Sequence, residues 1–512
     1  MTRSSSALAA AAMALAGMVA ADPLAAARLA AAHLAATRPA ATQLGASRPD
    51  AGWPSWRGPS RDGIAPGADP PIEWSEERNV RFKVEIPGRG SSTPIVWGDT
   101  IYLQTAISTG EDGDNEQRLE DWQQDGSEVF EGESYRPARV IQSFVVLALD
   151  RASGRERWRT EVERGLPHEG MHPTNTWASA SPVTDGRRLV AFFGSRGLHC
   201  LDLEGNVLWS KDLGDMDTRN GWGEGASPAL VGDLLVVNWD HEGESFLAAF
   251  DVATGEQRWR TPRDEPSSWF TPAPAAVGDG HQIVTIGAHR VRGYDLASGE
   301  LVWHGPGLSL NAIPTPLVHD GVAYLTSGYR ETNLLAVDLE RAAGAIEGGG
   351  EGGEGGEGGE GGALLWRYDR DTPYVASPLV LGNTLYLTKH LRGILSLLDA
   401  RTGERRLGPV RLPGIRNLYA SPVAAAGRVY FAGREGVTVV VAHHEGGDGE
   451  SGESEAPARS GLDVLAVNTL DDGFDTSPAV VGSELYLRGR RFLYRIDEDP
   501  AIAQSDSSSP PR

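Results

Sequence analysis

A short sequence pattern recurs eight times along this chain of 512 residues. Each copy starts with a small residue and a proline, continues through an apolar stretch and a Gly-containing turn, and ends in alternating apolar residues. Copies without a long insertion repeat every 42 to 46 residues, which is the length of one four-stranded propeller blade. The prolines that mark the copies are Pro94, Pro182, Pro228, Pro274, Pro316, Pro378, Pro422 and Pro478.

A second pattern follows each copy and predicts a hairpin. It consists of an apolar residue, an Asp, a turn with Thr or Ser before Gly, and a strand that often ends in Trp, as in 148–158, 249–259 and 293–303. The Gly supplies the positive φ of a tight turn, and the Asp caps the turn backbone. We expect the tryptophans to pack between neighbouring blades; they are Trp158, Trp209, Trp259, Trp303 and Trp366.

The last copy predicts how the ring closes. It ends at residues 492–497 without an outer strand, whereas residues 72–88 contain such a strand ahead of the first copy. We expect this N-terminal segment to complete the last blade, because full closure removes exposed sheet edges. The predicted fold is all-β: a single eight-bladed propeller of four-stranded antiparallel blades over residues 51–498.

Most of the net charge of −23 lies in three segments. Residues 111–133 contribute −9, and residues 347–360 and 445–455 contribute −5 each. Gly-Glu repeats lack the apolar groups of a core, so we predict solvated loop insertions at 107–139, 343–362 and 443–460. A fringe that attracts cations is the alternative. The overall acidity argues against a nucleic-acid partner.

The two ends of the chain differ in composition from the repeats. Residues 1–21 combine Arg3, an apolar stretch and small residues before Asp22, which predicts a secretory signal peptide; an uncleaved anchor is the alternative. We expect a disordered Ala-rich leader at 22–50 and a disordered tail at 499–512. Beyond residue 50 no apolar run is long enough to span a membrane, so we expect a periplasmic or extracellular protein.

The hairpin pattern resembles the tryptophan-docking repeat of the pyrroloquinoline quinone (PQQ) propellers. The segment WPSWRGPSRDG at 53–63 is similar to the start of secreted bacterial PQQ-like repeat proteins, and the resemblance covers residues 53–498. It implies one of two roles. Quinoprotein dehydrogenases bind PQQ and Ca²⁺ and oxidise alcohols or sugars, whereas the BamB-like scaffold of the outer-membrane β-barrel assembly machinery binds protein partners. A shared fold does not choose between them.

The candidate ligand site is the mouth of the central funnel, where each inner strand begins just before its proline. If the eight copies are equivalent, the side chains at these positions face the funnel, where propellers bind ligands. Glu224 and Asp475 are the candidate carboxylates for Ca²⁺, and Trp222 or Trp269 would stack on a flat cofactor. Alternatively, these residues cap strand ends and fill the channel. The candidates are Asn175, Trp177, Trp222, Glu224, Trp269, Asn311, Tyr374, Asn417 and Asp475.

Two further sequence features limit the enzyme interpretation. Cys200 is the only cysteine, so the adjacent cysteine pair of many alcohol-oxidising quinoproteins is absent. HEGMH at 168–172 matches the zinc-protease pattern H-E-x-x-H, but Pro167, Gly170 and Pro173 argue against the helix that this pattern requires. We therefore assign no catalytic residues, and the metal ligands stay unknown.

The sequence favours an exported, monomeric, non-catalytic propeller that binds an envelope protein or polymer. One alternative is a quinoprotein dehydrogenase that holds PQQ and calcium in the funnel. The other is a carbohydrate-binding propeller that uses Trp177, Trp222 and Trp269.

Overall fold

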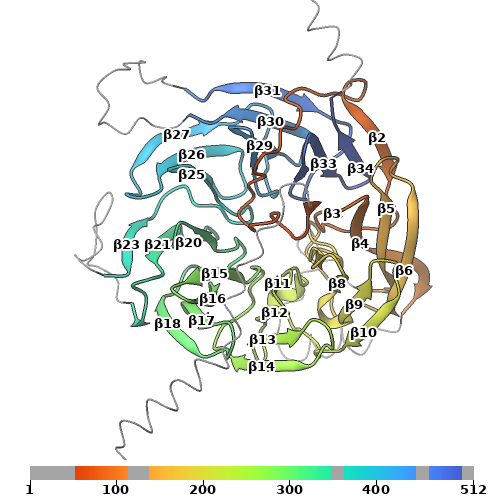
Figure 1. The fold of residues 1–512 in the computed structure, drawn as a ribbon, viewed down its shortest axis with the longest axis horizontal. Coiled ribbons are helices and arrows are strands. Elements are labelled where there is room, and N and C mark those ends of the chain that lie inside the picture. Colours follow the sequence, from red (N-terminus) through yellow and green to blue (C-terminus); the bar gives the residue numbers. More distant parts are fainter. Residues whose placement is uncertain (1–51, 114–137, 347–361, 445–460, 499–512) are drawn as a thin grey trace, which may run out of the picture. The chain divides into compact units, whose positions relative to one another are not determined.

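The computed structural model describes residues 52–113, 138–346, 362–444 and 461–498. Within this part of the chain, eight β-sheets follow one another around a central axis and form an eight-bladed propeller, as predicted (Figure 1). The signal peptide, leader and tail expected at 1–21, 22–50 and 499–512 lie outside the described residues, as do the acidic cores of the three insertions. Of the described residues, none belongs to a helix that is long and apolar enough to span a membrane.

In the first four blades the strands follow one another from the axis outward. Blade 1 contains β1 (Gly52–Trp53), β3 (Ile95–Trp97), β4 (Thr100–Asp112), β5 (Val140–Asp150) and β6 (Glu156–Gly165). Blade 2 contains β7 (Val183–Thr184), β8 (Arg188–Phe192), β9 (Leu198–Asp202) and β10 (Val207–Lys211). Blade 3 contains β11 (Ala229–Val231), β12 (Leu234–Trp239), β13 (Phe246–Asp251) and β14 (Gln257–Pro262). Blade 4 contains β15 (Ala273–Val277), β16 (Gly280–Thr285), β17 (Arg290–Asp295), β18 (Leu301–Pro306) and β22 (Gly344–Ala345).

The other four blades complete the ring. Blade 5 contains β19 (Leu317–His319), β20 (Val322–Ser327), β21 (Asn333–Asp338) and β23 (Leu364–Tyr368). Blade 6 contains β24 (Leu379–Leu381), β25 (Thr384–Thr388), β26 (Ile394–Asp399) and β27 (Arg405–Arg411). Blade 7 contains β28 (Val423–Ala425), β29 (Arg428–Ala432), β30 (Val437–Ala442) and β31 (Val464–Thr469). Blade 8 contains β32 (Ala479–Val481), β33 (Glu484–Arg488), β34 (Phe492–Ile496) and β2 (Val80–Glu85).

Two blades carry a strand beyond the predicted four. The short β1 pairs with β3 of blade 1, and β22 pairs in parallel with β18 of blade 4. The structure also contains two short 3-10 helices, η1 (Gly194–Arg196) and η2 (Arg219–Gly221). Strand β4 runs to Asp112, inside the range that we assigned to the first insertion.

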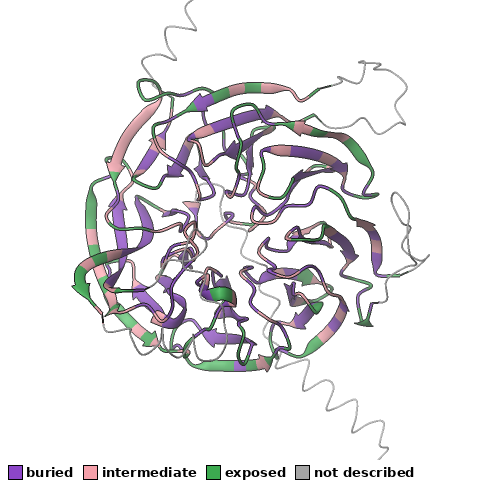
Figure 2. Ribbon diagram, turned by 180° about the vertical axis from the view of Figure 1, so that it is seen from behind, coloured by how far each residue is buried: buried purple, intermediate pink, exposed green. Residues whose placement is uncertain are grey.

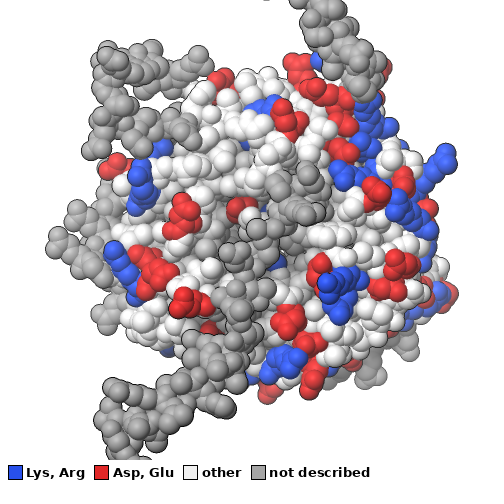
Figure 3. All heavy atoms as spheres, in the orientation of Figure 1, with Lys and Arg blue, Asp and Glu red and all other residues white. Residues whose placement is uncertain are grey.

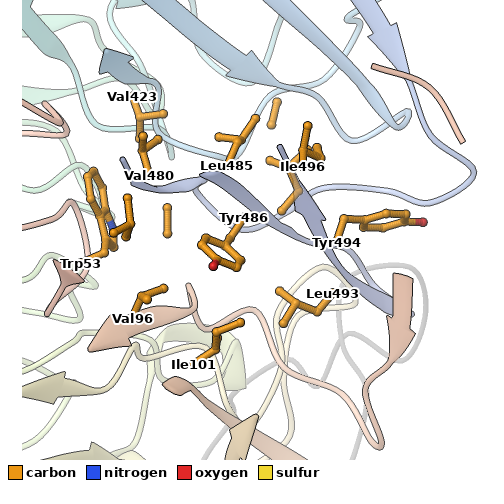
Figure 4. Packing of buried hydrophobic residues seen from close by; sticks show 14 of the residues in the cluster. Trp53, Val96, Ile101, Val423, Val480, Leu485, Tyr486, Leu493, Tyr494 and Ile496 are labelled. Carbon is orange, nitrogen blue, oxygen red and sulfur yellow. The ribbon is translucent and has the colours of Figure 1, made fainter. Parts of the chain in front are cut away.

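The ring closes as predicted, through the N-terminal strand. Strand β2 pairs antiparallel with β34, from Val80 opposite Ile496 to Glu85 opposite Phe492. A hydrophobic cluster fills the seam between the first and last blades, where Val96 and Ile101 meet Leu485 and Tyr486 (Figure 4). The first and last strands of the ring are therefore held by both backbone hydrogen bonds and apolar burial.

Tryptophans link successive blades. The indole Nε1 of Trp209 in blade 2 donates to the carbonyl oxygen of Val252 in the hairpin turn of blade 3, at 3.0 Å. Trp158, Trp259 and Trp366 make the same bond to the next blade, at 3.0, 2.9 and 3.2 Å respectively. Trp303 is the exception, because its Nε1 donates to Gln282 of its own blade at 2.8 Å.

A ring of hydroxyl side chains surrounds the axis. In blades 1 to 7 the residue before the repeat proline donates its backbone N–H to the hydroxyl of the equivalent residue in the next blade, at distances from 2.8 to 3.2 Å. This hydroxyl ring consists of Thr93, Ser181, Ser227, Thr271, Thr315, Ser377, Ser421 and Ser477.

The hydroxyl ring corrects the alignment of the fourth copy. Thr271 precedes Pro272, and β15 starts directly after Pro272, as the other inner strands start after their prolines. The repeat proline of blade 4 is therefore Pro272 and not Pro274. The spacing to Pro228 and to Pro316 then becomes 44 residues on each side.

Residues 52–70, which we call the strap, cross the ring at the end where the inner strands finish (Figure 1). The strap bonds to blade 2 through Thr184, to blade 6 through Pro378, to blade 7 through Ala424 and to blade 8 through Gly482. The guanidinium of Arg61 also donates to the Leu230 carbonyl of blade 3. One segment thus ties together blades that are far apart in sequence.

Burial and charge follow this architecture. The inner strands are mostly buried, and the outer strands alternate between exposed and buried residues (Figure 2). On the face shown in Figure 3, acidic and basic side chains are interspersed around the rim, and neither sign forms a continuous field. This pattern is that of a solvated outer surface, and it leaves the funnel as the candidate for a specific site.

Candidate funnel site

A cavity of about 460 Å³ lies at the axis, within the size range of small-molecule sites. All eight blades and the strap contribute to its wall. Six members of the hydroxyl ring line it, and Trp56 reaches it from the strap, with its Nε1 donating to Ser477 Oγ at 3.2 Å. The aromatic residues and histidines that line the cavity are Trp56, His172, Trp222, Trp269, Tyr329, Tyr374, His390 and Tyr419.

Several of these rings hold one another in place. Tyr374 stacks against His390 with ring centres 5.3 Å apart, and Tyr329 lies 5.0 Å from Tyr374 on its other side. On the opposite wall, His172 meets Trp222 edge to face at 5.8 Å. Burial raises the pKa of the Tyr374 hydroxyl to about 12, so this group stays protonated and able to donate at neutral pH.

Five of the nine predicted residues line the funnel, namely Asn175, Trp222, Trp269, Tyr374 and Asp475. The amide of Asn175 is already occupied: its Nδ2 donates to the carbonyls of Trp222 and Glu224, at 2.9 and 3.1 Å. Its Oδ1 accepts from the N–H of Thr176 and the hydroxyl of Ser179. Asn175 therefore ties together the loops that lead into blades 2 and 3.

The other four predicted residues do not line the funnel. Trp177 and Glu224 line a smaller neighbouring pocket of about 40 Å³. Asn311 is buried and lies near the Tyr374 hydroxyl, and Asn417 donates to the carboxylate of Glu435 at 3.1 Å. Positions before the eight prolines are thus not equivalent, because the loops that lead to them differ in length and path.

Three carboxyl groups line the small pocket, namely those of Glu169, Glu224 and Asp240, and Asp240 is paired with Arg263 at 2.7 Å. Glu224 accepts the Ser195 N–H at 2.8 Å and bonds the Ser195 hydroxyl, and burial raises its pKa to about 7. Glu169 is also buried, and it accepts the N–H of Thr218 at 2.9 Å and of Gly223 at 3.1 Å. Burial and the negative charge of Glu224 hold the pKa of Glu169 well above its usual range. Glu169 and Glu224 therefore stabilise loops and are not presented to a ligand in the funnel.

The HEGMH segment forms a loop, as expected from its prolines. His168 interacts with Asp217 at 2.9 Å and with Asp215 at 3.1 Å, whereas His172 interacts with Thr174 and points to the funnel. No group of three or more His, Cys, Asp or Glu able to hold a metal ion occurs among the residues that the structure describes.

Asp475 is the sole carboxylate among the described residues of the funnel wall, and two arginines occupy it. Arg434 Nε donates to Asp475 Oδ1, and Arg490 Nε donates to Oδ2 at 2.8 Å. Arg434 also lies over the ring of Tyr419, with its guanidinium carbon 4.1 Å from the ring centre. This wall is thus positively charged and held rigid by an ion pair and a cation–π contact.

A second set of loops contributes residues that the sequence pattern did not predict. Tyr329, His390, Arg434 and Arg490 lie in the turns between the second and third strands of blades 5 to 8. These turns reach the same face as the segments before the prolines, because adjacent strands run antiparallel. In the sequence, each of these four residues is a polar or aromatic residue just after the second strand of its blade, and this pattern could have identified them.

Comparison with known families and structures gives the relatives of this chain. The sequence model of the family described as "Outer membrane protein assembly factor BamB" matches residues 142–349. The chain has the fold of the PQQ-like propellers. Comparison with curated proteins gives no match.

Two solved structures are similar to this PQQ-like propeller. BamB from Moraxella catarrhalis is 13% identical, with a TM-score of 0.50 over 82% of this chain and 97% of that chain. Quinohemoprotein alcohol dehydrogenase ADHIIG from Pseudomonas putida HK5 is 12% identical, with a TM-score of 0.53 over 88% of this chain and 80% of that chain. At these identities the likeness concerns the fold, and both a scaffold and an enzyme share it.

The donor set of the funnel does not fit the Ca²⁺ that PQQ enzymes use. Calcium takes six to eight oxygen ligands, and carboxylates are foremost among them. Here both oxygens of Asp475 accept from guanidinium groups, and Glu224 bonds Ser195 outside the funnel. The amide of Asn175 is fully used by its neighbours. The described residues of the funnel wall therefore offer no calcium cradle and no unoccupied carboxylate to act as a general base.

Proposed function

We propose that this PQQ-like propeller is a non-catalytic binding module of the cell envelope, which holds a segment of a polymer or protein partner in its funnel. One observation carries the proposal: the funnel is lined by eight aromatic or imidazole rings, whereas its sole described carboxylate is held by two arginines. Such a wall offers stacking surfaces and hydrogen-bond donors. It lacks the free base and metal ligands that oxidation of an alcohol requires.

The placement in the envelope rests on two supports. The matching family is described as an outer membrane assembly factor, and the sequence predicts a signal peptide at residues 1–21. A rigid ring suits a binding role, because a preformed site loses little conformational entropy when its ligand binds.

The test separates binding from catalysis. The purified full chain is titrated with PQQ plus Ca²⁺ and followed by tryptophan fluorescence and dye-linked alcohol oxidation. We expect no Ca²⁺-dependent fluorescence change and no turnover. Calcium-dependent turnover that Asp475→Asn abolishes would contradict the proposal.

The binding half of the proposal is tested by capture from solubilised envelope material. We expect the native chain to retain a component that Trp269→Ala releases, because Trp269 lines the funnel and donates its Nε1 to the Gly223 carbonyl at 2.6 Å. Trp97→Ala is the matched control, because Trp97 packs outside the funnel. Equal capture by all three proteins would contradict a funnel site.

A further inference from the structure

A second cavity of about 180 Å³ adjoins the funnel between blades 8 and 1. The two cavities share part of their walls, namely Ser91, Thr174, Asp475 and Thr476. We call the second cavity the arginine pocket, because Arg89, Arg434, Arg488 and Arg490 line it. Four guanidinium groups against the one carboxylate of Asp475 give its described wall a formal charge of +3, in a chain with a net charge of −23.

Arg488 is the deepest of these arginines. Its side chain is buried, and only Nη1 forms hydrogen bonds to described residues, namely to Ser92 O at 2.9 Å, Ser92 Oγ at 2.7 Å and Gln104 O at 3.0 Å. No described carboxylate pairs with it, and burial lowers its pKa to about 9. A buried cation without an anionic partner is costly, and an anion in the pocket would supply that partner.

Gly90 leaves the approach to Arg488 open. A Cβ atom at position 90 would stand 2.6 Å from Arg488 Nη2 and 2.8 Å from the Gln104 carbonyl oxygen, which is too close for any residue other than glycine. Because Gly90 and Arg488 both line the arginine pocket, the missing side chain keeps Nη2 accessible from the cavity.

Arg434 is oriented in a way that leaves donors for a ligand, whereas Arg490 bonds Asp475 through both Nε and Nη2. Arg434 bonds Asp475 through Nε, and its Nη groups make no hydrogen bond to a described residue. The nearby carboxylates of Asp472 and Glu435 are occupied by other groups: Asp472 accepts the N–H of Arg490 at 3.0 Å, and Glu435 accepts from Asn417. Neither Asp472 nor Glu435 lines the pocket, although both carboxylates, after Asp475, attract the Arg490 guanidinium and help to raise its pKa.

The funnel beside this pocket offers aromatic faces and hydroxyl groups. Five hydroxyls of the ring line the cavity and accept a backbone N–H, namely those of Ser181, Ser227, Thr271, Ser421 and Ser477, so the O–H of each remains able to donate. Sugar rings present C–H faces that pack on aromatic side chains and hydroxyls that pair with such donors. Aromatic faces beside hydroxyl donors therefore suit a saccharide.

We propose that the funnel binds an acidic saccharide, with its rings on the aromatic wall and a uronic-acid carboxylate on Arg434, Arg488 and Arg490. This inference rests on the proposed binding function and names its ligand class. A carboxylate accepts two N–H donors side by side, which matches the geometry of a guanidinium group.

Binding is tested on the full chain with trigalacturonate and with its neutral methyl ester, by titration calorimetry. The acid is expected to bind about tenfold more tightly than the ester, since hydrogen bonds to charged groups are worth more than those to neutral ones. Arg434→Gln and Arg490→Gln should each reduce the preference for the acid over the ester. Arg490 is largely exposed, so its variant is expected to fold. Arg416→Gln, in an 81% exposed side chain outside the pocket, is the matched control and should behave as the native chain.

Each outcome bears on a different part of the inference. Equal binding of acid and ester, lost in Trp269→Ala, would overturn the role of the arginine pocket and leave the funnel as a binding site. Inorganic phosphate that binds as tightly as trigalacturonate would mean an adventitious ion only. A tetraglutamate peptide that binds more tightly than the saccharide would overturn the saccharide class in favour of a peptide. Absence of any saccharide binding, with envelope capture retained, would overturn this inference alone.

Discussion

The backbone N–H of Ser181 in blade 2 donates to the Oγ of Ser227 in blade 3 at 2.8 Å, and both residues are buried. Ser227 in turn donates its own N–H to Thr271 Oγ1 at 3.2 Å. Seven such bonds link Thr93 through to Ser477 around the axis, and in each the hydroxyl before a repeat proline satisfies a backbone donor of the neighbouring blade. This relationship explains why the repeat begins with Ser or Thr.

Replacing Ser227 tests the hydroxyl ring. Ser227→Ala leaves the buried N–H of Ser181 without an acceptor, so we expect a loss of about 1–3 kcal/mol, seen as a lower melting temperature. Ser227→Thr keeps a hydroxyl at this position, as Thr271 does at the equivalent position of blade 4. The melting temperature of this variant should stay close to that of the native chain. A melting temperature for Ser227→Ala equal to that of Ser227→Thr would contradict a stabilising role for the ring.

Glycine substitutions test the docking of tryptophans between blades. Gly255 has φ +70° and lies under Trp209, and a Cβ atom there would stand 2.8 Å from the indole. Gly278 has φ +53° and open space around it. Both Gly→Ala variants carry the backbone cost of a positive φ, about 1–2 kcal/mol. The difference between their melting temperatures therefore reports the clash of the added methyl group with the Trp209 indole. We expect Gly255→Ala to melt at a lower temperature than Gly278→Ala, and equal melting would count against the docking contact.

The raised pKa of Glu224 predicts how stability depends on pH. In the folded chain burial raises this pKa from 4.5 to about 7, so the folded state binds more protons than the unfolded state between these values. The resulting stabilisation is complete below the unfolded pKa and is lost as the pH rises through about 7. Glu169 acts in the same direction.

Glu224→Gln is the matching variant, because the amide has the shape of the neutral acid. Its melting temperature should fall less between about pH 5 and about pH 8 than that of the native chain. Identical pH profiles of the two proteins would show that Glu224 ionises as readily when folded as when unfolded.

The strap is tested at Arg57. This buried side chain donates Nη2 to the carbonyl of Asp62 at 2.5 Å and to that of Pro378 in blade 6 at 2.7 Å. Arg57→Ala leaves both carbonyls unpaired and opens a cavity, so we expect a loss of about 2–4 kcal/mol and a lower melting temperature. Arg416→Ala, at a largely exposed position, is the control and should change stability by less than about 0.5 kcal/mol. A similar melting temperature for both variants would argue that the strap adds no stability.

The fold was predictable because its signals are local and repeated. A Ser-Pro or Thr-Pro start, a turn glycine and an Asp-to-Trp hairpin each specify a strand end through backbone geometry, and eight copies fix the number of blades. The closing strand was predictable because the last copy lacks an outer strand and residues 72–88 supply one. The choice of Pro274 over Pro272 failed because blade 4 contains two prolines and only the hydroxyl of Thr271 distinguishes them.

The site was less predictable, since it depends on loops that do not repeat. Trp222 and Asp475 line the funnel as expected, but Glu224 lies behind it because the loop that precedes Ser227 directs the carboxylate toward Ser195. The contribution of Trp56 arises from a strap that crosses the ring, which no periodic pattern reveals. Arg434 and Arg490 meet at Asp475 from two different blades, and sequence spacing does not place them together.

The most direct test of saccharide binding in the funnel is a crystal structure of the full chain with trigalacturonate, at a concentration that saturates binding in solution. We expect sugar rings against Trp222 and Trp269 and a carboxylate beside Arg434 and Arg490. A saccharide on the outer rim, or a funnel without saccharide under these conditions, would contradict a binding site in the funnel.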